Sequence, residues 1–256
     1  RVIDFYFIDK DNGFIIAENG EILSTNDGCT TWKSTTMEDI TLIDIFSYDE
    51  NNAWILGKEN SGWSSTGVLF RTVDGGITWN RHDLSSRSCK CLFFISETKG
   101  WIAGAYGDIK MTNNGGVSWA DKSIEGDYNP DIFFIHFTDD QNGIILAEDN
   151  GIICGKTTNG GSSWNLNFAG VENYFGGGFC KGTDFYYAVG ENGLILGTEN
   201  HGKNWALPSN NLRNNLYSIA FSDNLTGWAV GEDSTILKTT DGGTSWEPQA
   251  MPIFWA

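Results

Sequence analysis

The stretch Thr239–Trp246 reads TTDGGTSW, and five further segments of the chain repeat its pattern, T-x-[DN]-x-G-x-[ST]-W, with small departures. The six segments end at Trp32, Trp79, Trp119, Trp164, Trp205 and Trp246. Successive tryptophans are separated by 47, 40, 45, 41 and 41 residues. Six such periods account for all 256 residues, so we predict a single repeat domain over residues 1–256.

The last period shows what one repeat contains. Leu216–Ser222 alternates apolar and polar residues, and GWAVG at Gly227–Gly231 and TILKTT at Thr235–Thr240 follow after short turns. The segment Thr244–Gln249 completes the period. Four short strands joined by tight turns are typical of a β-propeller blade. Sustained helical periodicity is absent from the sequence, so we predict an all-β fold, a β-propeller with six four-stranded blades.

The residue types of the repeated turn explain its role. Asp or Asn at the third position can accept hydrogen bonds from the backbone amides that follow it. Gly at the fifth position permits a positive φ, and the closing Trp supplies a large apolar surface that packs between neighbouring sheets. Cys29 replaces this Gly in the first repeat, while His201 and Asn204 alter the fifth. We expect these two turns to be looser.

The repeated turn resembles the Asp-box, or BNR repeat, and the longer pattern GWAVG…ILKTTDGGTSW is similar to the photosystem II assembly and stability factors and their relatives in non-photosynthetic bacteria. The resemblance covers all six periods and implies a propeller whose Asp-boxes are structural. Family members of the photosystem type have seven blades, which is the alternative to six. Asp-boxes also occur in sialidases, xyloglucan-active hydrolases and sorting receptors. The assembly factors dock their client through an arginine-rich patch, whereas this chain has only five arginines, so the resemblance implies a shared scaffold rather than a shared client.

Composition excludes several classes of function. The net charge of −17 argues against nucleic acid and anionic membrane surfaces as partners, because both are bound through basic footprints. The longest apolar runs are far shorter than a membrane span requires, so we expect no membrane insertion. The five cysteines include no CxxC pair and are expected to be small buried residues. From the initial Arg1 and the habit of the family, we expect a periplasmic or extracellular protein.

The turns between the second and third strands of the repeats contain the candidate binding residues. In a propeller these turns share one face, and that face usually carries the binding site. Carboxylates recur there, which indicates either hairpin chemistry and solubility or a rim that attracts cations and Lys or Arg side chains. The candidate residues are Glu18, Trp63, Tyr106, Asp108, Glu148, Glu191 and Glu232.

Two aromatic candidates differ from the carboxylates. Trp63 lies in the insertion Lys58–Gly67, which we expect to be a loop, and it either stacks on a sugar or a partner side chain or packs on an adjacent loop. His136 lies on the alternating strand Ile132–Thr138, on the same face as Ile132 and Phe134, and we expect it to face the channel. The three histidines show no metal-ligand spacing, so we expect neither a metal nor a cofactor.

We therefore predict a non-enzymatic, monomeric scaffold module that binds a protein partner or a glycan, and we assign no catalytic residue. The alternative is a glycoside hydrolase or carbohydrate-binding protein that uses the mouth carboxylates. Such a hydrolase needs two carboxylates about 5–10 Å apart across a cleft. A sialidase would need an arginine cluster for the substrate carboxylate, and five scattered arginines do not indicate one.

Overall fold

The computed structural model describes residues 1–61, 64–84, 88–125, 129–168, 175–181, 185–200, 204 and 212–249. The chain divides into two compact units, Arg1–Asp140 and Gln141–Ala256, which are described separately. Among the described residues there is no α-helix, and none of their helical turns is long enough to span a membrane.

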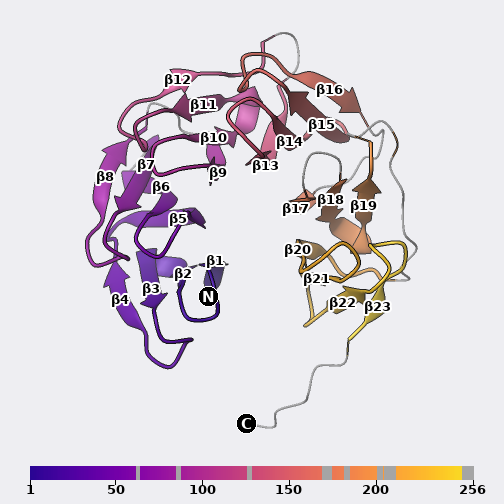
Figure 1. Cartoon of the computed structure of the whole chain (residues 1–256), viewed down its shortest axis with the longest axis horizontal. Helices are drawn as coiled ribbons and strands as arrows, with labels where there is room; N and C mark the ends of the chain where they lie inside the picture. Colours follow the sequence, from indigo (N-terminus) through magenta and orange to yellow (C-terminus); the bar gives the residue numbers. More distant parts are fainter. Residues whose placement is uncertain are drawn as a thin grey trace. The chain divides into compact units, whose positions relative to one another are not determined.

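The strands of the first unit are β1 (Val2–Phe7), β2 (Gly13–Ala17), β3 (Glu21–Thr25), β4 (Lys33–Thr36), β5 (Ile40–Ser47), β6 (Ala53–Ser61), β7 (Ser64–Thr72), β8 (Asn80–Asp83), β9 (Cys89–Phe94), β10 (Gly100–Gly104), β11 (Ile109–Thr112), β12 (Ala120–Asp121) and β13 (Asp131–Phe137) (Figure 1). Those of the second unit are β14 (Gly143–Glu148), β15 (Ile152–Thr157), β16 (Asn165–Phe168), β17 (Phe175–Lys181), β18 (Phe185–Gly190), β19 (Ile195–Thr198), β20 (Leu216–Phe221), β21 (Gly227–Gly231), β22 (Ile236–Thr239) and β23 (Glu247–Pro248). Three 3-10 turns complete the elements: η1 (Glu18–Gly20), η2 (Ala105–Gly107) and η3 (Glu191–Gly193).

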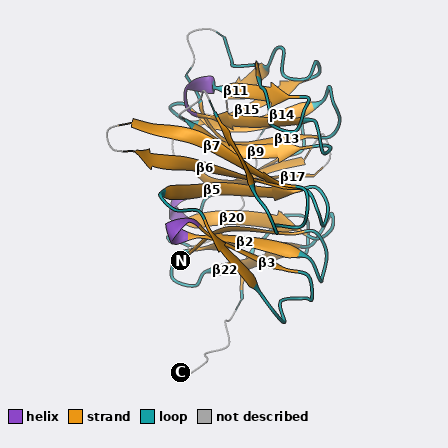
Figure 2. Ribbon diagram, turned by 90° about the vertical axis from the view of Figure 1, so that its left-hand side faces the viewer, coloured by secondary structure: helices purple, strands orange, loops and turns teal. Residues whose placement is uncertain are grey.

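The strands form six sheets in which each strand is the neighbour of the next strand along the chain. Five sheets have four strands, and the sheet β17-β18-β19 has three among the described residues. This up-and-down order is that of propeller blades, and strands dominate the ribbon in Figure 2. The prediction of an all-β, six-bladed propeller is confirmed.

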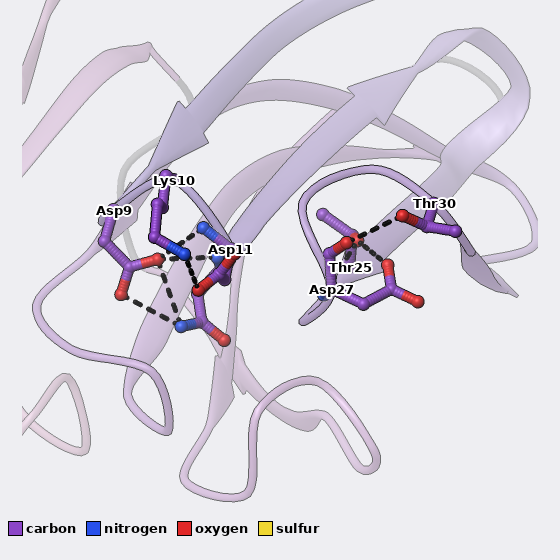
Figure 3. Close-up of polar contacts among 7 residues, drawn as sticks. Asp9, Lys10, Asp11, Thr25, Asp27 and Thr30 are labelled. Carbon is purple, nitrogen blue, oxygen red and sulfur yellow. Dashed lines mark hydrogen bonds and ion pairs between the residues drawn. The ribbon is translucent and has the colours of Figure 1, made fainter.

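Every Asp-box closes its turn with the same hydrogen bonds. The Thr hydroxyl donates to the Asp or Asn side chain at 2.8–3.1 Å, and the amide of the seventh residue donates to the same oxygen at 2.9 Å. In the first repeat the Gly28 amide of this turn donates to the Asp11 carbonyl of the β1–β2 turn. Figure 3 shows side-chain hydrogen bonds within each of these two turns. Hydrogen bonds from Thr78 and Ser245 hold the pKa of Asp74 and Asp241 at about 2. These carboxylates are ionised turn formers.

The two departures from the repeat keep their turn bonds. Cys29 adopts the left-handed conformation that Gly occupies elsewhere, with φ 67°, and its amide still donates to Thr25. In the fifth repeat the Asn204 amide donates to Asn200 at the usual 2.9 Å, while His201 lies outside the described residues. The expected loosening is therefore wrong for the bonds that the structure describes. Cys29 is exposed and the other four cysteines are buried, so the burial prediction fails only at Cys29.

The first strand of the repeat carries a bulge that the sequence pattern did not indicate. Register shifts occur at the same place in β1, β5, β9, β17 and β20. The bulged backbone comes so close to the second strand that a Cβ at Gly104 would lie 1.8 Å from the Ser88 carbonyl oxygen. A Cβ at Gly231 would likewise lie 2.0 Å from the Asn215 oxygen. At Gly104 and Gly231 the bulged backbone thus leaves no room for a Cβ, whereas Ala17 occupies the equivalent position beside the bulge of β1.

Tryptophans fill the spaces between sheets, but two positions in the repeat are buried to different depths. On the second strand, Trp54 and Trp101 are fully buried, and each stacks on a phenylalanine ring at 3.9 Å and 3.5 Å respectively. The Asp-box tryptophans are mostly half-buried, with Trp246 the buried exception and Trp205 outside the described residues. Trp228, at the same second-strand position of the last repeat, is 36% exposed, so the deep burial is a property of Trp54 and Trp101 and not of the position itself.

The insertion Lys58–Gly67 is not a loop. It extends the hairpin of β6 and β7, in which Lys58 pairs with Gly67 and Glu59 with Thr66. At nine residues each, these strands are longer than their counterparts in the other repeats (Figure 2). Trp63 lies outside the described residues.

The depth of burial predicts unequal losses of stability. Trp54→Ala is expected to lower the free energy of unfolding by about 3–5 kcal/mol, because it removes a stacked, fully buried ring. Trp119→Ala removes a half-buried ring and is expected to cost about half as much. Urea denaturation of both variants measures the difference, and equal losses would contradict this account of the packing.

Candidate functional site

The predicted rim residues occupy equivalent turns in their repeats. Glu18 opens η1, Tyr106 is the middle residue of η2, and Glu191 opens η3. The middle residue of each of these turns has a positive φ, namely 63° at Asn19, 62° at Tyr106 and 56° at Asn192. Glu148 ends β14 and Glu232 follows β21, at the corresponding place in their repeats. The sequence pattern thus located the turns correctly.

In the first unit the rim carboxylates have local cationic partners. Asp108 forms an ion pair with Lys110 at 3.0 Å, and both side chains are largely buried. Glu59 accepts two hydrogen bonds from the Arg81 guanidinium, at 3.0 and 2.9 Å, and these hydrogen bonds lower its pKa. Glu18 lies 3.8 Å from the amino terminus. The charge of these three carboxylates is partly compensated within the turn or hairpin that carries them.

Tyr106 differs from the other residues at its position. Its side chain is 75% exposed, and its backbone is in the left-handed region where Asn stands in η1 and η3. An Asn tolerates this conformation, whereas a bulky aromatic residue is uncommon in it. A tyrosine that is both exposed and unfavourably placed contributes little to folding.

A shallow depression lies at the η1 turn, between the first and second repeats. It has a volume of about 470 Å³ and is lined by Ile3, Glu18, Asn19, Asp39, Ile40 and Thr41. The depression combines two carboxylates with apolar side chains from β1 and β5. This composition suits a polypeptide surface with a basic or amide group.

In the second unit, Glu232 is the rim carboxylate with the most extensive described network. Its Oε1 accepts from the Tyr217 hydroxyl at 2.6 Å and from the Asn215 side chain at 3.1 Å. These hydrogen bonds, that from Tyr217 foremost, lower the pKa of Glu232. Glu148 and Glu191 are half-buried at the turns of their own repeats. All three are held within separate hairpins.

His136 packs within an aromatic row on the first strands of the repeats. Tyr6, Phe46, Phe93 and His136 come from β1, β5, β9 and β13, and their successive ring centroids are 5.0, 5.0 and 4.4 Å apart. Burial lowers the pKa of His136 to about 4, so the ring is neutral near pH 7. This environment is that of a packed ring rather than a general base.

The prediction that Ile132, Phe134 and His136 share one face of their strand is wrong in part. Ile132 is fully buried, whereas Phe134 and His136 are half-buried with parallel rings. By alignment of the repeats, the bulge seen in β1, β5 and β9 corresponds to the step between Ile132 and Phe134 in β13. A bulge at this step reverses the alternation.

A carboxyl pair that the sequence reasoning missed lies on the first strands of the first two repeats. Asp4 and Asp44 are hydrogen-bonded to each other, and burial, with the neighbouring Asp4 carboxyl, raises the pKa of Asp44 well above its usual range. Asp44 also accepts from the Leu92 amide at 2.8 Å, and Asp4 from the Ile45 amide at 3.3 Å. Each carboxyl thus bonds the backbone of the next first strand. The sequence did contain a signal for this pair, since Asp4 and Asp44 occupy the same position of the first strand in two successive repeats.

The Asp4–Asp44 pair does not have the geometry of a glycosidase active site. Two carboxyl groups in direct hydrogen-bond contact leave no room for a glycosidic bond, which needs a separation of about 5 Å or more. In the part of the chain that the structure describes, no three His, Cys, Asp or Glu side chains are arranged to hold a metal ion. The rim carboxylates, in turn, sit on separate hairpins.

Comparison with known proteins identifies a family whose model matches this chain. The family model described as Photosynthesis system II assembly factor YCF48 matches residues 1–90 and 198–254, more than half of the chain. The chain is 28% identical over 125 residues to the Photosystem II assembly lipoprotein Ycf48 of Synechococcus sp. (strain CC9902), a match that covers 46% of the chain and 35% of that protein. The matched part spans about a third of the length of the curated relatives.

Solved structures show the same fold. The structure of "YCF48 bound to D1 peptide" has a TM-score of 0.75 at 18% identity, over 96% of this chain and 80% of that one. The GH74 xyloglucanase from Xanthomonas campestris has a TM-score of 0.78 at 12% identity, over 97% of this chain and 45% of the enzyme. At these identities the likeness establishes a β-propeller and nothing about the activity of this chain.

The Asp4–Asp44 pair predicts an unusual dependence of stability on pH. A carboxyl whose pKa is raised on folding stabilises the protein fully below its unfolded pKa of about 3.9, and this contribution is lost as pH rises through the folded pKa. Asp44→Asn cannot ionise and is expected to be more stable than the parent protein at pH 7, by on the order of 1 kcal/mol. The difference is expected to shrink toward pH 4 in denaturant titrations.

A second substitution separates charge from hydrogen bonding. Asp44→Ala removes the acceptor of the Leu92 amide and is expected to destabilise the protein at every pH. Parallel stability curves for the parent and Asp44→Asn between pH 4 and 7 would contradict the raised pKa.

Proposed function

The chain belongs to the family described as Photosynthesis system II assembly factor YCF48, and on that premise we propose that it is a non-enzymatic propeller that binds a protein partner. The binding surface that we propose is formed by the turns between second and third strands, with Tyr106 as its anchor. A solved relative of the same fold, "YCF48 bound to D1 peptide", supports a polypeptide as the class of ligand.

Tyr106 is the observation that carries the proposal. Its ring is 75% exposed on a left-handed residue, a position where Asn would stabilise the turn better. Exposed tyrosines anchor protein interfaces because they bury a large area at little cost in side-chain entropy. The depression at η1, with Glu18 and Asp39, offers further acceptors to basic or amide groups of the partner.

The remaining rim residues are proposed as contacts within their own units. Asp108 lies at the turn of Tyr106, and Glu148, Glu191 and Glu232 occupy the equivalent turns of the second unit. The net charge of −17 favours partners with basic surfaces and increases their rate of association. Trp63, which lies between β6 and β7 in the sequence, is proposed as a further contact.

We further propose that the protein acts as a monomer in a periplasmic compartment. The lipoprotein names of two curated relatives support this compartment. None of the compared relatives supports an extracellular location. Glycan binding is the less favoured form of the proposal, because its support is a likeness of fold to xyloglucanases at 12–14% identity.

The proposal predicts that Tyr106→Asn abolishes partner binding without loss of stability. The immobilised parent protein is expected to retain a specific protein from the soluble proteome of its source organism, and Tyr106→Asn to retain at least tenfold less. The melting temperature of the variant is expected to equal or exceed that of the parent, since Asn suits the left-handed turn. Quantitative mass spectrometry of the retained proteins measures the ratio.

Val117→Asn is the matched control. Val117 is also exposed, but it lies in the Asp-box turn at the other end of β11 from Tyr106. Its substitution is expected to leave the retained set unchanged. An identical retained set for the parent and Tyr106→Asn, or release of reducing sugar from xyloglucan by the parent, would overturn the proposal.

A further inference from the structure

One contact between consecutive repeats uses the aromatic residue on the second strand. The Trp54 indole donates to the Gly115 carbonyl in the next Asp-box, with Nε1 and O 3.0 Å apart. In the second unit the Tyr187 hydroxyl donates to the Gly242 carbonyl, which is the equivalent acceptor. The two contacts lie at the same place in the repeat, one between the second and third repeats and the other between the fifth and sixth. Their surroundings can therefore be compared directly.

Beside Trp54 this place is filled by an arginine of the same chain. Arg71 pairs with Trp54 across β6 and β7, and its guanidinium carbon lies 5.4 Å from the centroid of the indole. The Arg71 Nη2 donates to the Glu97 carbonyl at 3.1 Å. The last repeat follows the same pattern, because Lys238 pairs with Trp228 and its ammonium lies 5.5 Å from that ring. A cation over the aromatic ring is thus a recurring feature.

The fifth repeat lacks this cation because Gly197 pairs with Tyr187. A Cβ at Gly197 would lie 2.8 Å from the Tyr187 ring, so this ring packs directly over the glycine. A pocket of about 250 Å³, lined by Tyr187 and by Gly242 of the following Asp-box, lies next to the ring, and we name it the Tyr187 pocket. Its apolar wall is formed by the rings of Phe179, Phe185, Tyr187 and Phe221.

The polar wall of the Tyr187 pocket is acidic. Glu199 and Asp241 line it, and hydrogen bonds from Ser245 and Thr239 keep Asp241 ionised. Asn224 occupies the position that Glu97 has in the third repeat, and its carbonyl oxygen would lie 3.1 Å from a Cβ at Gly242. The residues that line the pocket, all of them described, include no basic side chain. The pocket therefore has the acceptors and the ring that surround Arg71, without the arginine.

We propose that the Tyr187 pocket receives an arginine side chain of the partner protein. The guanidinium would lie over Tyr187 as Arg71 lies over Trp54, donate to the Asn224 carbonyl, and pair with Glu199 and Asp241. Arginine suits this place better than lysine because its planar group stacks on rings and donates in several directions at once. The inference rests on the proposed function only in taking the guest from a protein partner.

Binding of a small probe tests the pocket directly. N-acetyl-arginine amide is expected to shift the backbone amide resonances of Gly197, Tyr187 and Gly242 in a saturable way at millimolar concentrations. N-acetyl-citrulline amide has the same shape without the charge, and it is expected to bind at least tenfold more weakly. Equal binding of citrulline, or tighter binding of N-acetyl-leucine amide, would show an apolar pocket and overturn the proposal.

One substitution and a control connect the probe to the pocket. Glu199→Gln keeps the volume and is expected to weaken arginine binding at least threefold, while Glu247→Gln, an exposed carboxylate on β23, leaves it unchanged. Equal affinities of the Glu199→Gln and Glu247→Gln variants overturn the proposal.

The result of the probe experiment does not depend on whether the proposed function is correct. The probe binds or fails to bind at Gly197 whether or not a protein is retained through Tyr106. Retention of a partner by a protein that shows no arginine shifts would overturn the pocket alone.

Discussion

A four-stranded sheet has two apolar faces and cannot bury both by itself, so each repeat depends on its neighbours. The second-strand aromatic residue meets this constraint most directly. Trp54 is fully buried, stacks on Phe94, and donates to the Asp-box of the following repeat at Gly115. The hydrogen bonds of the Asp-box Thr and its Asp or Asn fix the turn, and the fixed turn holds the Gly115 carbonyl in place for Trp54. The repeated residues therefore form contacts between repeats as well as turns within them.

The same packing bears on the surface that we propose around Tyr106. At the Asp-box ends of the strands, Asp74 and Asp241 are ionised and accept hydrogen bonds within their own turns. At the opposite turn of the third repeat, the exposed Tyr106 adopts a conformation that folding alone disfavours. Membership of an assembly-factor family agrees with a scaffold that acts by contact.

Periodicity and turn chemistry were sufficient to predict the six sheets, the position of the rim turns, and the structural role of Asp27 and its equivalents. The features that were missed depend on pairing between strands. The bulge on the first strands breaks the alternation that placed Ile132 with His136, and nothing in a period of two announces it. The hairpin around Lys58 needed cross-strand register to distinguish it from a loop. The Asp4–Asp44 bond needed knowledge of which strands become neighbours.

Gly197 shows that equivalent positions of the repeats can carry residues of different kinds. Each repeat touches only its neighbours, so the residue at one interface can change without altering the others: Trp54 pairs with Arg71 and Trp228 with Lys238, whereas Tyr187 pairs with Gly197 and Trp101 with Met111. A chain of duplicated units thus carries spare versions of every structural contact. The contact in one repeat can therefore change and acquire a new role, while the contacts in the other repeats maintain the fold.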